Sequence, residues 1–140
     1  MNKLLLTILF IIFFNISVSA KPLILECGEM TGISTLFENR EINTSKDSLK
    51  GSSKLKLDFK TGEFKLIREG FNNFSEDLNI INYNEYGFVF YSTHKEVTKI
   101  FNLFSMSDNL YFLVMTEHQS QLLTNIPQAR TLRAICKSPT

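Results

Sequence analysis

The feature that most constrains the fold is a pair of cysteines placed near the two ends of the chain. Cys27 and Cys136 are the only two cysteines among 140 residues. A disulfide requires Cα atoms within about 7 Å of each other. If these two cysteines are bonded, the first and last structured segments lie side by side or face to face, as when a meander closes into a barrel. The bond then closes a loop of about 110 residues, for which the chain-entropy estimate is about 4–5 kcal/mol.

The first twenty residues have the layout of a secretory signal. A lysine precedes an apolar run over 4–14, and a tail of small residues ends at Ala20. A membrane-spanning helix needs about 20 apolar residues, so this run is too short for an anchor, and its small-residue exit favours cleavage after Ala20. We therefore predict a signal peptide at 1–20 and a single exported domain at 21–140. That domain is expected to be secreted or periplasmic, with no membrane span after signal removal.

Export also decides how the two cysteines are interpreted. An exported chain meets an oxidising compartment, where an even pair of cysteines is read as a disulfide. Neither Cys27 nor Cys136 belongs to a Cys-x-x-Cys pair or stands beside a histidine, which disfavours a reactive or metal-bound thiol. The sequence therefore predicts a Cys27–Cys136 bond.

Charge and composition exclude some partners. The whole chain carries a formal net charge of +1, and removal of the signal removes one lysine and no acid, leaving about zero. A neutral domain gives no electrostatic argument for nucleic-acid binding, and we expect no nucleic-acid partner. No motif calls for a cofactor. Of the thirteen phenylalanines, ten lie in the exported part, which is enough for a packed core without tryptophan.

Alternation of apolar and polar residues, the signal of a β-strand, dominates the exported part. The clearest case is Lys54–Phe59, and the same pattern predicts a first strand at 23–27 and a last one at 130–137. Hairpins are expected at 54–68, 78–92 and 97–116, although 97–104 also fits helical spacing. The turn-rich segments 43–53, 70–77 and 117–129 are expected to be connections. We predict an all-β fold: a single small antiparallel barrel or sandwich of about six to eight strands.

The two histidines are the only candidates for enzyme chemistry. His94 and His118 each have a carboxylate nearby, so a small hydrolase or a metal-dependent enzyme using both is the alternative function. Zinc sites normally use three or four protein ligands at recognisable spacing, and no such spacing is present. Both histidines fall among polar residues in expected connections. We therefore predict that the protein is not an enzyme and has no catalytic or metal-binding residue.

Two aromatic residues are the best candidates for a binding contact. Phe71 and Phe74 stand in a polar, turn-forming segment, where they either cap the end of the core or meet a partner. Residues 46–68 are locally basic, which fits either an anionic partner or the solvated face of a hairpin. We predict that Phe71 and Phe74 are binding residues and that the basic stretch serves mainly solubility.

In plan, the chain resembles small exported bacterial β-proteins such as the periplasmic inhibitors of lysozyme. The resemblance rests on the signal, on Cys27-Gly28 in the first strand and on Cys136 in the last. The Ser-Gly-x-x-Tyr type of loop found in those inhibitors is not present, so the resemblance implies no active residue. The sequence thus predicts a small, disulfide-linked, non-enzymatic domain that binds a protein partner or a small apolar ligand.

Overall fold

The computed structural model describes residues 21–38, 40–69, 74–119 and 128–139. The predicted signal peptide and Phe71 lie outside these ranges. Within them the chain forms ten strands: β1 (Leu23–Cys27), β2 (Met30–Glu38), β3 (Glu41–Leu49), β4 (Ser52–Asp58), β5 (Glu63–Glu69), β6 (Phe74–Asn84), β7 (Gly87–His94), β8 (Val97–Ser107), β9 (Leu110–Gln119) and β10 (Gln128–Lys137). No helix in this part of the chain is long and apolar enough to cross a membrane.

Eight of the strands close into an antiparallel barrel. The order is β1-β4-β5-β6-β7-β8-β9-β10, and β10 pairs back with β1. The all-β fold, predicted as a barrel or sandwich of about six to eight strands, is confirmed as an eight-stranded barrel with two further strands outside it. The first and last strands and the three expected hairpins are confirmed too. The segment that also fitted helical spacing is strand β8, which pairs along its length with β7 and β9. Its buried residues, Phe101 and Leu103, are two positions apart, which is the spacing of a strand and not of a helix.

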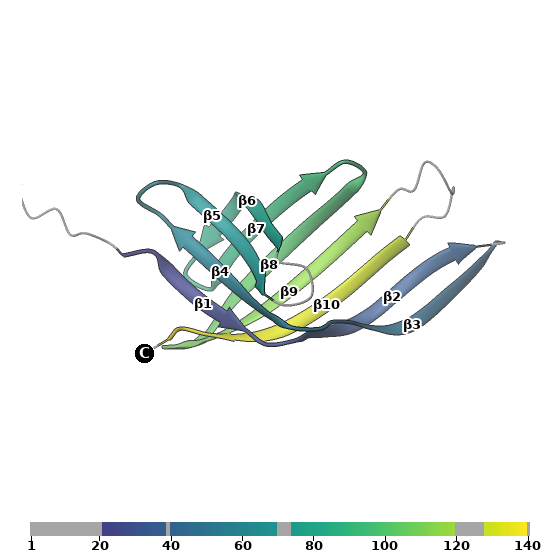
Figure 1. Ribbon diagram of the computed structural model, residues 1–140, viewed down its shortest axis with the longest axis horizontal. Helices are drawn as coiled ribbons and strands as arrows, with labels where there is room; N and C mark the ends of the chain where they lie inside the picture. The colour runs from purple at the N-terminus through teal and green to yellow at the C-terminus, as the bar shows by residue number, and fades with distance from the viewer. Residues whose placement is uncertain (1–20, 39, 70–73, 120–127, 140) are drawn as a thin grey trace, which may run out of the picture.

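The two remaining strands form an arm that extends from the barrel (Figure 1). β1 continues into β2, and β3 continues into β4, so β2 and β3 are the far half of one long bent hairpin. Cys27 faces Cys136, yet Thr31, four residues later, faces Arg133 instead of Leu132. The strand therefore holds one extra residue, a bulge that bends it. We call the hairpin of residues 30–49 the arm.

Gly32 allows the arm to lie against β10. A Cβ atom added at Gly32 would come within 1.9 Å of the backbone oxygen of Thr131, far inside van der Waals contact. Only a residue without a side chain lets β2 approach β10 this closely. The arm therefore depends on glycine at this position.

The barrel interior is filled by apolar side chains. Its fully buried members come from β1, β4, β7, β8, β9 and β10 and from the start of β2, and the largest are Phe90 and Phe101. Four phenylalanine rings gather at one end, with centroids 5.2 to 5.9 Å apart: Phe59, Phe64, Phe88 and Phe90. We call this the aromatic end.

The disulfide joins the strands that close the barrel. Cys27 and Cys136 are bonded, with Cα atoms 3.9 Å apart, and they face each other directly in the β1–β10 pair. Both side chains are buried in the core. The predicted bond, and the predicted contact between the first and last strands, are confirmed.

The expected connection at 43–53 was wrong. Residues 41–49 form β3, a strand that has no buried residue and is polar on both faces. Because β3 lies outside the barrel except at its end, only its last residue, Leu49, packs against the core, and the apolar alternation that marks a half-buried strand is missing. The connections expected at 70–77 and 117–129 are shorter, since β6 begins at Phe74, β9 ends at Gln119 and β10 begins at Gln128.

Candidate functional site

A chain of alternating charges lines the end of the barrel opposite the aromatic end. Ser92 donates a hydrogen bond to Glu76, and the Lys99 Nζ atom lies 2.8 Å from the other Glu76 oxygen. Lys99 also lies 3.9 Å from Glu117, which holds Arg130 through two contacts of 2.9 Å. Glu76 and Glu117 are 7% and 5% exposed, so both carboxylates are buried, whereas their partners Lys99 and Arg130 are half-buried. We call these five residues the charged end.

The charged end also holds the arm. Arg130 reaches Asp47 on β3, with an N–O distance of 3.7 Å. The Gln128 amide donates a hydrogen bond of 3.0 Å to the Ser34 hydroxyl on β2. Each of the two arm strands is therefore tied by a polar side-chain contact to β10. These contacts fix the angle at which the arm leaves the barrel.

Phe74 lies at the edge of the charged end. Its side chain is 41% exposed, and the Lys99 ammonium stands 5.3 Å from the centre of its ring. A cation at this distance from an aromatic face is attracted by the ring's electrons. Phe74 therefore takes part in the cation network and also presents an apolar edge to solvent. Its predicted role as a binding residue stays a prediction.

The two histidines are not brought together. His118 lies on β9 and faces Thr98, whereas His94 lies on β7 and faces Val97. Val97 and Thr98 are consecutive residues of β8, so they point to opposite faces of the sheet and place the two histidines on opposite faces too. Both are exposed and lie on strands instead of in the expected connections. This geometry gives no support to a joint acid–base or metal site.

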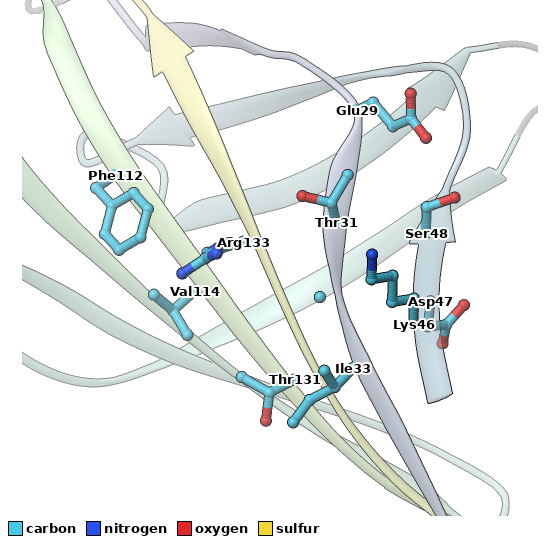
Figure 2. A pocket seen from close by; sticks show the side chains of 11 residues that line it. Glu29, Thr31, Ile33, Lys46, Asp47, Ser48, Phe112, Val114, Thr131 and Arg133 are labelled. Carbon is cyan, nitrogen blue, oxygen red and sulfur yellow. The ribbon is translucent and has the colours of Figure 1, made fainter. Parts of the chain in front are cut away.

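The larger concavity lies on the outer face of the barrel wall, beside the arm. It has a volume of about 950 Å³, and Figure 2 shows the side chains of β2, β3, β9 and β10 around it. We call it the outer trough and define it by the residues that form its floor and walls: Thr31, Ile33, Lys46, Phe112, Val114, Thr131 and Arg133. The acidic residues Glu29 and Asp47 also line it.

Strand register explains how this mixture of residues forms one surface. Side chains that face each other across an antiparallel pair point to the same face. Val114 faces Arg133, which faces Thr31 on the arm, and in the next outward row Thr131 faces Ile33, which faces Lys46. The inward neighbours of the β9 and β10 residues belong to the core. This part of the outer trough is thus the reverse side of two barrel strands, and the arm forms the rest.

The trough has an apolar floor and free cations. Ile33 is 51% exposed although it is a large apolar side chain. Among the described residues, the charged groups of Lys46 and Arg133 have no ion-pair or hydrogen-bond partner, and both are exposed. Of the two acidic residues in the lining, Asp47 is paired with Arg130, so the trough can hold an apolar group and offer positive charge at Lys46 and Arg133, away from Glu29. A second concavity of about 390 Å³ continues toward the tip of the arm and includes Phe37 and Ile42.

Most of the basic stretch is neutralised by local acids. Lys54 pairs with Glu69 at 2.8 Å, and Lys56 and Lys65 both hold Glu63 at 2.6 Å. Hydrogen bonds from Lys56 and then Lys65 lower the pKa of Glu63 from 4.5 to about 2. These lysines form cross-strand ion pairs on the solvent face of β4 and β5, as expected if the basic stretch serves mainly solubility. Lys46 differs because no acid faces it.

The sequence matches no family model, and comparisons with curated proteins and with solved structures gave no significant match. Function is therefore inferred from the geometry of this chain. Sequence reasoning missed the outer trough because it placed 43–53 in a connection. It missed the charged end because Glu76 and Glu117 are far apart in the chain.

Proposed function

We propose that this protein is an exported, non-enzymatic binding protein whose recognition surface is the outer trough. The observation that carries the proposal is a concavity of about 950 Å³ with an exposed apolar floor and two unpaired cations. Ligand sites usually enclose about 300–1,000 Å³ and are lined mainly by apolar groups with a few polar ones. The trough has the size and composition of such a site.

The outer face is a better location than the barrel interior. The interior is occupied by its own side chains, with Leu25, Leu55, Leu113 and Leu132 fully buried there. At the charged end, Glu76 and the other ionised groups bind one another. The outer trough, in contrast, leaves its cations and its apolar floor without partners among the described residues.

Export is supported by the disulfide. Structural disulfides persist in oxidising compartments, such as the periplasm and the extracellular space. Cys27 and Cys136 are bonded and buried, and the described residues contain no free cysteine. This is compatible with a secreted or periplasmic protein. We propose that the partner is met there.

The binding of an anionic aromatic probe tests the proposal. 1-Anilinonaphthalene-8-sulfonate combines an apolar body with a sulfonate, and we expect saturable, one-to-one binding to the folded protein, followed by its fluorescence. The substitution Ile33→Ser removes an apolar side chain from the trough floor. The matched control is Ile81→Ser, because Ile81 lies on β6 and is 56% exposed, close to the 51% of Ile33.

We expect Ile33→Ser to weaken probe binding about tenfold, since burial of a side chain of this size contributes ~1.5 kcal/mol or more. Ile81→Ser should leave it unchanged. Thermal unfolding of each variant checks that the fold is intact. Equal probe binding by the wild type and Ile33→Ser would locate the probe elsewhere and contradict the proposal.

A further inference from the structure

The outer edge of β3 is a row of backbone groups without a partner strand. β3 is the last strand in the sheet order and pairs only with β2 among the described strands. Its nine residues, Glu41–Leu49, are therefore hydrogen-bonded on one side. In an antiparallel pair, alternate residues direct both N–H and C=O away from the partner. About half of the β3 residues thus present these groups at the free edge.

We propose that the natural partner is an extended polypeptide segment that adds to β3 as a further strand and places an acidic side chain against Lys46. The inference rests on the proposed function, because β3 forms one wall of the outer trough. A regular row of backbone donors and acceptors is matched by another β-strand, and strand addition of this kind is a common mode of peptide recognition. The free edge favours a partner with an extended backbone, and the side chains on the trough side of β3 determine which side chains of the partner fit.

The side-chain preference follows from the outward face of β3. Ile42 is 71% exposed, Lys46 is exposed and without a charged partner, and both point to the trough side of the arm. A strand that lies antiparallel to β3 has its own outward side chains directly opposite these two. An apolar residue facing Ile42 and a carboxylate facing Lys46 complement both positions.

A second copy of the chain does not meet this requirement. A symmetric pairing of two β3 strands centred on Lys46 places two lysines opposite each other, which is unfavourable. Pairings centred on Ser45 or Thr44 place Lys46 opposite Thr44 or Ile42. None of the three registers brings a carboxylate to Lys46. The occupant that fits is therefore a different polypeptide.

A capped peptide, Thr-Thr-Lys-Glu-Thr-Thr-Thr-Val-Thr, is the probe. In antiparallel register with Leu49 to Glu41, its glutamate faces Lys46 and its valine faces Ile42. Titration of the ¹⁵N-labelled full exported domain should shift the amide resonances of β3, and it should slow hydrogen exchange at alternate β3 amides. Two further peptides carry methyl groups on their backbone nitrogens. In one peptide the odd-numbered residues are methylated, and in the other the even-numbered residues are methylated.

Backbone methylation separates strand addition from docking by side chains. Only one set of peptide amides faces β3, so one methylation pattern should weaken binding at least tenfold. The other pattern should leave the affinity within about twofold, because a single edge of the strand is used. If both methylated peptides bind like the unmodified one, strand addition is wrong, while the recognition surface itself stays supported by the dye assay.

A charge exchange tests the acidic preference. Lys46→Glu should weaken the peptide about fivefold, the factor that corresponds to ~1 kcal/mol for an exposed ion pair. A peptide with lysine in place of its glutamate should bind Lys46→Glu better than it binds the wild type. Lys60→Glu, in the β4–β5 turn far from the arm, is the control and should change neither affinity.

Two further results would overturn the inference without touching the proposed function. One is an absence of β3 shifts at millimolar peptide while the dye still binds. The other is a dimer in sedimentation whose β3 amides are protected before any peptide is added, since the edge would then belong to a second copy.

Discussion

Loss of the Cys27–Cys136 bond should destabilise the domain more than any single core substitution. The bonded residues are 109 positions apart, so the chain-entropy relation gives about 5 kcal/mol for the restriction of the unfolded chain. The bond also joins β1 to β10 at the seam where the barrel closes, which has the fewest paired residues of any two neighbouring strands in the barrel. β1 and β10 pair directly at two positions, and one more backbone hydrogen bond runs from Gly28 to Ile135. With so few contacts, the seam depends on its covalent link.

Urea unfolding of the oxidised protein, the reduced protein and the Cys27→Ala/Cys136→Ala variant provides the measurement. For an m-value of about 2 kcal/mol per molar, 5 kcal/mol corresponds to a midpoint lower by roughly 2.5 M. The m-value of the reduced protein should rise, because the unlinked unfolded chain expands and exposes more surface. Hydrogen exchange should accelerate first in β1. A midpoint change below about 0.5 M would refute the reasoning, because it would show that the seam closes without the bond.

Three other perturbations test separate parts of the structure. Glu117→Ala removes both 2.9 Å contacts of the half-buried Arg130, while Lys99 keeps Glu76, and it should lower the free energy of unfolding by about 2 kcal/mol, measured by urea titration at constant pH. Gly32→Ala inserts a Cβ atom 1.9 Å from a backbone oxygen, so it should speed hydrogen exchange in β2 and abolish dye binding while near-ultraviolet circular dichroism of the barrel persists. Glu63, whose pKa is lowered from 4.5 to about 2 by Lys56 and Lys65, stabilises the fold above pH 4.5, and this contribution is lost as the pH falls toward 2. Glu63→Gln should flatten the pH dependence of the urea midpoint across that window, and an unchanged slope would contradict the assignment.

The barrel could be predicted from the sequence because its strands are half-buried. β4 is the clearest example: Leu55 and Leu57 point inward and Lys54 and Lys56 point outward, which gives strict alternation. The cysteines then required the ends of the meander to meet. Burial of one face therefore leaves a readable period of two in the sequence.

The arm could not be predicted in the same way. β3 buries neither face, so its residues carry no apolar period, and its composition of Ser, Thr, Asn, Lys and Asp is that of a loop. Its strand conformation comes from pairing with β2, residue by residue from Glu41 to Leu49. A strand that pairs outside the core has no buried face, so the pattern of apolar residues in its sequence does not reveal it.

The charged end did leave a signal, although a subtle one. In β9 the inward positions run Leu113, Met115, Glu117, so a carboxylate follows two core residues on the same face. β8 shows the same step in reverse, where Lys99 precedes Phe101. A charged residue at the next inward position of a strand predicts a polar layer at that end of a barrel. Four strands supply matching charges at this end because their register aligns the charged residues in one layer. The tertiary fold sets that register.

This layering also explains why recognition should fall on the arm. At the charged end, Lys99 and Arg130 are held by the buried carboxylates of Glu76 and Glu117, so an incoming anion would have to displace contacts of 2.8 to 2.9 Å. Lys46 and Arg133 stand outside this network and have no such contacts. An anionic partner therefore gains more by binding the outer trough than by entering the barrel mouth. The same ion pairs that close the mouth hold the arm through Asp47, and so they position the surface that remains free to bind.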